Sequence, residues 1–169
     1  MGQYEYPNLL SGTRSGKGWT YQGPAGGAFK YDKERNYLAL HGTSKSEFFM
    51  KSPPVVLHKN IDYTLHCLSA NTANMSSTDI YVLDIDGPSS GYQYIGAGLY
   101  KKNPLGGMWL DWTFRLDANA RDGGSFRLRF DNNGSTDGED CLVWFRDVML
   151  TEGTEPRAWA PAEGEVWPE

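Results

Sequence analysis

The sequence lacks a long apolar run and a strong charge of either sign. No segment approaches the roughly 20 apolar residues that a membrane-spanning helix needs, and residues 1–6 are polar where a secretion signal would be apolar. We therefore expect a chain without membrane insertion and without a secretion signal of its own. Its formal net charge of −5 argues against a nucleic-acid partner, since phosphates demand a basic surface.

Cysteine is also scarce. Cys67 and Cys141 lie far apart, each inside an apolar alternating segment, and neither has a second cysteine at metal-binding spacing. We predict two buried free thiols, because free cysteine packs as a small hydrophobe. A disulfide between two core strands remains the alternative.

Motifs of catalysis are missing as well. The sequence contains no nucleophile elbow, no zinc-protease motif and no phosphate-binding loop. The three histidines, His41, His58 and His66, have no ligand spacing between them. Asp84 and Asp86 share one face of an expected strand, and Asp111 could approach them as a glycosidase pair, but such carboxylates are usually solvated. We predict that the protein is not an enzyme.

What the sequence does contain is aromatic residues in two-residue alternation, best seen in residues 109–153. Three apolar segments there, 109–116, 126–130 and 142–150, are separated by clusters of Asp, Asn and Gly. Leu110, Trp112 and Phe114 fall on one face of the first segment, which leaves Trp109, Asp111 and Arg115 on the other. This pattern predicts three antiparallel strands of a half-buried sheet.

Similar segments occupy the rest of the chain. They cover residues 4–10, 37–41, 48–50, 55–57, 61–68, 80–85 and 92–101. Residues 11–27 form a glycine-rich loop that carries Trp19 and Tyr21, and no segment has helical periodicity. Nine or ten short strands with glycine-rich turns predict one all-β sandwich domain over residues 1–153. Residues 154–169, which are rich in proline, are expected to form a C-terminal strap or linker.

The order of the three segments in 109–153 resembles the C-terminal half of carbohydrate-binding jelly-roll modules. A Trp-led strand is followed by a strand rich in Phe and Arg that ends in Asp131-Asn132, and the last strand closes on Val148-x-Leu150-x-x-Gly153. Residues 8–13 and 149–159 fit the same group, which occurs in glycan-active enzymes and in phage tail proteins. The resemblance implies a jelly-roll β-sandwich of two antiparallel sheets that binds a polysaccharide or oligosaccharide without catalysis.

The chain's ending narrows that resemblance. The Glu152-Gly153 turn and the Trp159-Ala160-Pro161 tail are similar to modules of phage tail and receptor-binding proteins. This implies a phage or prophage tail module, in the virion, that adsorbs to bacterial cell-surface polysaccharide. Two alternatives stay open: a structural module that contacts other tail proteins or its own copies without binding sugar, and an extracellular module from a secreted glycoside hydrolase.

Sugar binding needs a flat ring face and planar polar groups beside it. The outward residues that supply both are Trp109, Asp111, Arg115, His66, Tyr92 and Tyr94, with Trp19 and Tyr21 on a rim loop. We predict that they line one groove, with the strand order implied by the resemblance. As alternatives, Trp109 packs under a loop, and Arg115 and Asp111 form an ordinary surface ion pair.

The resemblance also raises the question of a structural calcium ion. Modules of this group often hold one through an acidic residue in the last strand, and that position falls here on Arg146, next to Asp147. A cation cannot ligate calcium, which prefers several hard oxygen ligands. The oxygen-rich loop 131–140 keeps a calcium site possible, and no other cofactor is expected.

Overall fold

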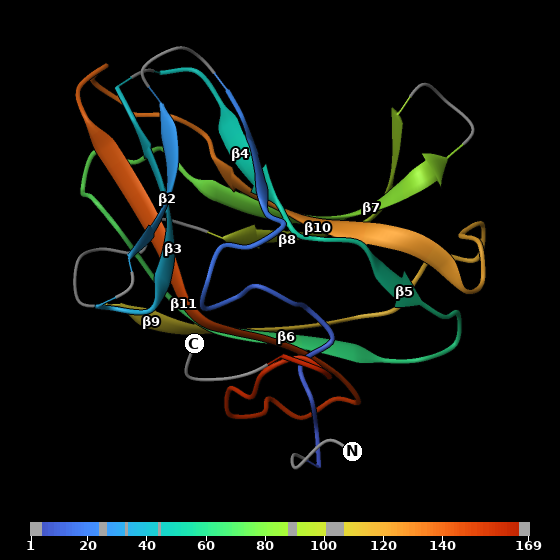
Figure 1. The fold of residues 1–169 in the computed structure, drawn as a ribbon. Helices are drawn as coiled ribbons and strands as arrows, with labels where there is room; N and C mark the ends of the chain where they lie inside the picture. The colour runs from blue at the N-terminus through green and yellow to red at the C-terminus, as the bar shows by residue number, and fades with distance from the viewer. Residues whose placement is uncertain are drawn as a thin grey trace.

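The computed structural model describes residues 5–23, 27–32, 34–43, 45–87, 91–100 and 107–165, with side chains described outside residues 86–100. In this part of the chain eleven strands and no helix are present, and every strand pair is antiparallel. The strands form two sheets that pack face to face (Figure 1). The predicted all-β jelly-roll β-sandwich is confirmed.

Each sheet mixes strands from distant parts of the sequence. The six-stranded sheet has the order β1 (Thr20–Gln22), β4 (Phe48–Lys51), β10 (Gly124–Asn132), β7 (Thr78–Gly87), β8 (Gly91–Tyr100), and β5 (Val55–Leu57) also pairs with β10. The five-stranded sheet has the order β2 (Ala28–Asp32), β3 (Tyr37–Gly42), β11 (Cys141–Glu152), β6 (Tyr63–Asn71), β9 (Met108–Phe114). β10 and β11 therefore lie at the centres of opposite sheets.

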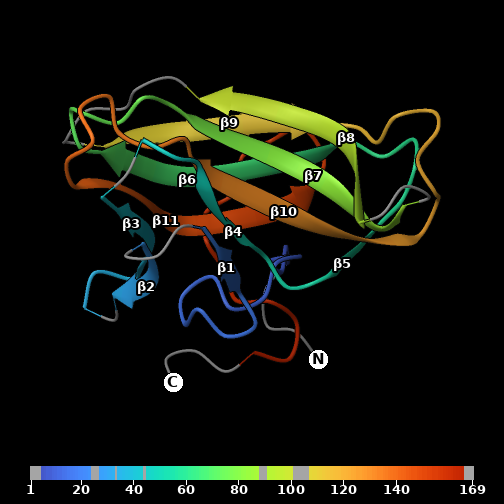
Figure 2. The same ribbon diagram turned by 90° about the horizontal axis from the view of Figure 1, so that it is seen from above.

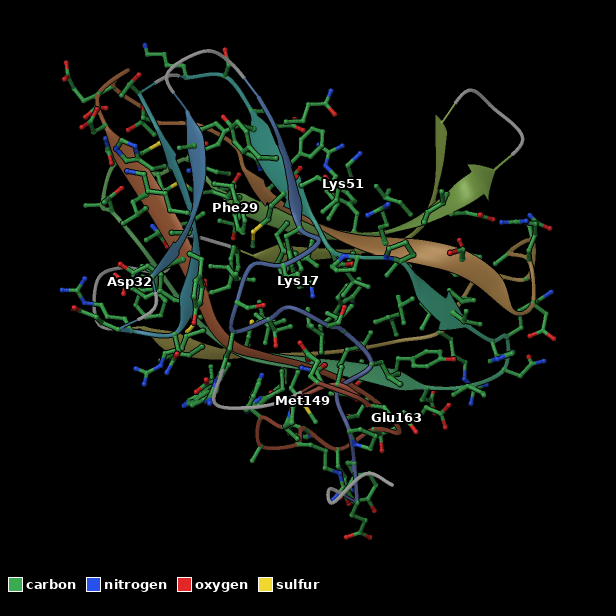
Figure 3. All side chains as sticks on the ribbon, in the orientation of Figure 1. Lys17, Phe29, Asp32, Lys51, Met149 and Glu163 are labelled. Atoms are coloured by element: carbon green, nitrogen blue, oxygen red, sulfur yellow. The ribbon has the colours of Figure 1, made fainter. Side chains whose placement is uncertain are left out.

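The core lies between the sheets and follows the predicted alternation. Phe126, Leu128 and Phe130 of β10 are fully buried, as are Leu65 and Cys67 of β6. Side chains from the two inner faces fill the space between the ribbons (Figure 3). Burial of this apolar surface is the main stabilising contribution to such a sandwich.

The six-stranded sheet is curved. In Figure 1 β1 and β4 rise at one side, and the end of β7 and the start of β8 rise at the other, so the outer face of this sheet is concave. Figure 2 looks down on that face, with β8, β7, β10 and β4 crossing it in turn. The outer face of the five-stranded sheet lies on the opposite side of the molecule.

The beginning of the chain differs from the prediction. The described residues 5–10 form no strand, and Asn8 makes only an isolated bridge to Ala162. Residues 20–22, expected within the glycine-rich loop 11–27, instead form β1, and β2 begins directly after the loop, so two strands of the observed fold were not predicted. Short strands among glycines carry too little alternation to be recognised.

The C-terminal segment packs against the N-terminal loop beneath β6 (Figure 1). Asn8 N–H donates to the carbonyl of Pro161 at 3.1 Å, and Trp159 Nε1–H donates to Thr13 Oγ1 at 2.9 Å. Glu165 accepts from the backbone N–H of Gly12 at 3.0 Å. Trp159, Pro161 and Glu165 therefore attach the C-terminal segment to residues 8–13. In the described residues no helix is long and apolar enough to span a membrane.

Both cysteines are free and buried, which confirms the predicted thiols. Cys67 lies in β6 and Cys141 begins β11, so both belong to the five-stranded sheet. Burial raises the pKa of each thiol, because a thiolate would lose its hydration in the core.

Candidate functional site

Trp109, His66 and Asp111 form one aromatic and polar patch on the outer face of the five-stranded sheet. In the register of β6 and β9, His66 lies opposite Asp111 and Leu68 lies opposite Trp109. The Trp109 and His66 rings are parallel, with centroids 4.6 Å apart and planes 3° from each other. This diagonal contact is typical of neighbouring antiparallel strands. We call these three residues the Trp109 patch.

The Trp109 patch combines exposure with fixed geometry. The exposed fraction of Trp109 is 52%, although tryptophan is usually well buried. His66 Nδ1 is hydrogen-bonded to Asp111 Oδ1, which fixes the imidazole plane beneath the indole. An aromatic surface held by its neighbours loses little conformational entropy on binding.

A second aromatic pair lies farther across the same sheet. Tyr37 of β3 stacks on Trp144 of β11 with ring centroids 5.5 Å apart. A Cβ on Gly107 would stand 3.3 Å from Leu68 and 3.6 Å from Trp144, so Gly107 lies against both side chains. The apolar surface therefore extends from Trp109 toward the middle of the sheet. Trp112 points inward as predicted, where its ring packs 4.6 Å from that of Phe114.

Arg115 does not belong to this patch. It follows the end of β9 and binds Asp62, with Nε to Oδ1 at 2.7 Å and the terminal nitrogen to Oδ2 at 3.3 Å. The suggested Arg115–Asp111 ion pair is therefore wrong, because each residue has another partner. Since Asp62 lies in the loop before β6, sequence alternation within β9 could not identify it.

Tyr92 and Tyr94 lie on β8, whose side chains are outside the described residues. The backbone register places Tyr94 opposite Leu83 in the six-stranded sheet, whereas the Trp109 patch lies on the five-stranded sheet. The prediction that Tyr92 and Tyr94 line one groove together with Trp109, Asp111 and His66 is therefore wrong. Strand alternation identifies outward positions but not the sheet to which a strand belongs.

Trp19 and Tyr21 lie inward and are not rim residues. Trp19 is 7% exposed, packs 5.6 Å from Phe130 and donates its Nε1–H to the carbonyl of Ser11 at 3.0 Å. Tyr21 packs edge-on against Phe48, and burial raises the pKa of its hydroxyl. The prediction of a binding role for this loop is wrong for Trp19, because a core indole offers no face to a ligand.

The concave face of the six-stranded sheet carries a polar cluster that was not predicted as a site. Arg129 stacks over Phe49 at 3.7 Å, and its guanidinium carbon lies 5.4 Å from the centroid of Tyr81. The same guanidinium binds Asp131 through two contacts of 2.6 and 2.9 Å and also contacts Glu47. The outward alternation of Arg127 and Arg129 in the sequence was the available signal for this cluster.

Burial shifts two ionisable groups in this cluster. Asp131 is 1% exposed, and its burial raises the carboxyl pKa to about 7 despite the neighbouring Arg129. Burial, together with the nearby Asp79 carboxylate, raises the pKa of Tyr81 to about 12. Tyr81 donates its hydroxyl hydrogen to Asp79 at 3.1 Å. Most of the polar groups here are therefore satisfied by one another.

The carboxylates considered for catalysis are separated. Asp84 of β7 is fully buried and is bound by Arg121 through two contacts of 3.0 and 2.5 Å. Asp111 belongs to the other sheet and binds His66, while the side chain of Asp86 lies outside the described residues. Asp84 therefore serves as a buried ion-pair partner, and the pair suggested with Asp111 does not form.

The loop considered for calcium uses its polar side chains internally. Asp137 accepts from Asn74 Nδ2 at 3.0 Å and from the N–H of Glu139 at 2.9 Å, which lowers the pKa of its carboxyl. Asn132 donates to the carbonyl of Leu40 at 3.2 Å. In the described part of the chain no three His, Cys, Asp or Glu side chains gather so as to hold a metal ion.

An open hollow of about 670 Å³ lies where the N-terminal segment meets the ends of β9 and β11. Its lining consists of Glu5, Tyr6, Pro7, Leu9, Asn60, Ile61, Asp62, Arg115, Thr151, Glu152 and Gly153. It is separate from the Trp109 patch, because Arg115 lies at the opposite end of β9 from Trp109.

Comparison with known proteins gives a likeness of fold. No family model and no curated protein matches the sequence. A CBM4 carbohydrate-binding module has a TM-score of 0.62 with 15% identity, over 85% of this chain and 100% of that one. The N-terminal cellulose-binding domain of Cellulomonas fimi β-1,4-glucanase C has a TM-score of 0.60 with 16% identity, over 89% and 99%.

A phage protein shares the fold as well. The enzymatically active domain of tailspike protein 4 from bacteriophage CBA120 has a TM-score of 0.58 with 10% identity. The match covers 86% of this chain but only 21% of the tailspike chain. The chain thus has the jelly-roll fold of carbohydrate-binding modules, as the sequence resemblance implied.

Proposed function

We propose that this chain is a non-catalytic glycan-binding module whose ligand stacks on the Trp109 patch. The observation that carries this proposal is the half-exposed Trp109 indole, held parallel to the His66 ring. A pyranose packs its C–H face on such a ring, while Asp111 beside it accepts hydrogen bonds from sugar hydroxyls. The fold shared with a cellulose-binding domain also supports glycan binding as the function.

For the parent protein and the glycan, we propose a phage or prophage tail module that recognises bacterial cell-surface polysaccharide. The shared fold of a tailspike domain supports it, together with the Trp159-Ala160-Pro161 ending. Such a protein acts in the virion, outside the host cell. The genes that flank the gene for this chain test the proposed phage origin. Tail and lysis genes would support it, whereas genes for secreted hydrolases would indicate a module from a glycoside hydrolase.

A glycan array that includes bacterial surface polysaccharides tests the binding itself, with and without calcium. We expect selective binding that Trp109→Ala weakens at least tenfold, about 1.4 kcal/mol. Val56→Ala is the matched control, since Val56 is 58% exposed on β5 in the other sheet. Thermal unfolding of both variants verifies that the fold persists.

Binding that survives Trp109→Ala in full would contradict the proposed site. The concave face with Phe49, Tyr81 and Arg129 would then be the next to test, through Tyr81→Ala. No binding to any glycan would contradict the function.

A structural role is the second candidate, and the exposure of two adjacent residues favours it. Met108 is 49% exposed beside Trp109, and exposed apolar side chains are enriched at protein interfaces. An assembly module is expected to form an oligomer that Trp109→Ala dissociates. Sedimentation of the wild-type chain and this variant distinguishes the two functions.

A further inference from the structure

We propose that the hollow beside Tyr6 is a second binding site, for a saccharide that carries a protonated amine. The hollow lies between the N-terminal segment, the loop before β6 and the end of β11, away from the Trp109 patch. Its volume of about 670 Å³ accommodates a short oligosaccharide and suits a ligand site.

The walls of the hollow have the surfaces that a sugar ring requires. Tyr6 is 38% exposed, and Leu9 and Ile61 add partly buried apolar surface. The guanidinium carbon of Arg157 lies 3.8 Å from the Tyr6 ring centroid, which holds the ring in place. A fixed aromatic ring beside aliphatic groups favours the C–H face of a pyranose.

The charge of the hollow selects the class of sugar. Asp62 binds the guanidinium of Arg115 through two contacts, so these two charges compensate each other. Glu5 and Glu152 are exposed, and in the described part of the chain neither forms an ion pair. Two uncompensated carboxylates at the rim favour a cationic ligand over a neutral or anionic one.

A buried hydroxyl provides independent support for a ligand here. Thr151 lines the hollow and is 3% exposed, yet its Oγ1 finds no hydrogen-bond partner among the described residues. Buried polar groups nearly always have partners, and leaving one without a partner costs free energy. A bound sugar hydroxyl, with a small rotation of the threonine side chain, would supply the missing partner.

The backbone around the hollow is fixed before any ligand arrives. Gly153 N–H donates to the carbonyl of Asp62 at 2.7 Å, and Thr64 Oγ1–H donates to the carbonyl of Gly153 at 2.7 Å. Gly153 has a φ of 104°, and a Cβ built on it meets no atom within 4 Å. The glycine therefore permits the turn and leaves open space at the edge of the hollow.

Titration calorimetry with a short glucosamine oligosaccharide tests the proposal, at low salt and a pH where the amine is protonated. We expect binding at least about tenfold tighter than for the fully N-acetylated oligosaccharide, which has the same ring but no charge. Added salt should weaken it, since the rim is exposed. A linear diamine supplies the charge without the ring and should bind far more weakly.

Variants locate the ligand. Glu152→Gln should weaken binding about fivefold and Tyr6→Ala at least as much, while Glu139→Gln should not change it. Glu139 is a matched control, because it is an exposed glutamate just before the start of β11, whereas Glu152 is at its end. Trp109→Ala should also leave this binding intact, so this test is independent of the proposed function.

Three outcomes would overturn the proposal. Equal affinity for the N-acetylated oligosaccharide would remove the role of charge, and equal affinity for the diamine would remove the role of the sugar ring. If Trp109→Ala abolished binding while Glu152→Gln left it unchanged, the ligand would be assigned to the Trp109 patch. Amide chemical shifts of Gly153 and Asp62 that stay unchanged on titration would exclude the hollow directly.

Discussion

Arg129 brings the carboxylates of Asp131 and Glu47 together around a single guanidinium group on the concave face. Two carboxylates cannot both be fully compensated by one cation, and Asp131 is the buried member. This arrangement explains why burial prevails over the ion pair and raises the pKa of Asp131 to about 7.

The raised pKa of Asp131 predicts a pH-dependent stability. In the unfolded chain this carboxyl has a value near 3.8, so the folded chain binds its proton more tightly. The stabilisation is complete below about pH 4 and is lost as pH rises to about 7. Asp131→Asn removes this titration, so its free energy of unfolding relative to wild type should rise over that interval. Denaturant unfolding across the interval measures it, and a constant difference would contradict the shift.

At the scale of elements, Asn8 attaches the N-terminal loop to β11. Its Oδ1 accepts from the N–H groups of Leu10 at 3.1 Å and Leu150 at 2.9 Å, and its Nδ2 donates to the carbonyl of Val148 at 2.7 Å. These contacts follow the irregular register between Arg146 and Met149. A single side chain thus satisfies backbone groups of β11 beyond Arg146, where the pairing of this strand with β3 ends.

Asn8→Ala should therefore destabilise the protein by about 2–4 kcal/mol, because it leaves buried backbone groups without partners. Asn133→Ala is a useful comparison, since Asn133 is only part-buried and bonds Ser77 and Asp79 side chains. We expect a smaller loss there, measured by denaturant unfolding. Equal losses would show that the backbone contacts of Asn8 are not decisive.

At the scale of the whole molecule, the two thiols report on global unfolding. Cys67 and Cys141 are buried in β6 and β11, two neighbouring strands of the five-stranded sheet. Burial also raises their pKa values, which keeps them in the unreactive thiol form. We expect a thiol reagent to label neither cysteine in the native protein and both in denaturant, at rates set by unfolding. Rapid native labelling of either one would indicate local opening of the five-stranded sheet.

The sequence predicted part of the candidate site. Alternation within β9 identified Trp109 and Asp111 as outward, and alternation within β6 identified His66; the structure brings these three together. Trp19 could not be assigned in this way, because it lies in a loop without alternation and its burial depends on the distant Phe130. The ion pair of Arg115 could not be predicted either, because its partner Asp62 follows a turn in a distant part of the sequence.

The sequence by itself determined the all-β class, the inward faces of β6, β9 and β10, and the free cysteines. These are local consequences of two-residue alternation and turn chemistry. Only the tertiary structure decided which strands share a sheet, and so which outward residues meet. Sheet membership depends on long-range pairing, such as β6 with both β9 and β11, and the hollow beside Tyr6 exists only because distant segments converge there.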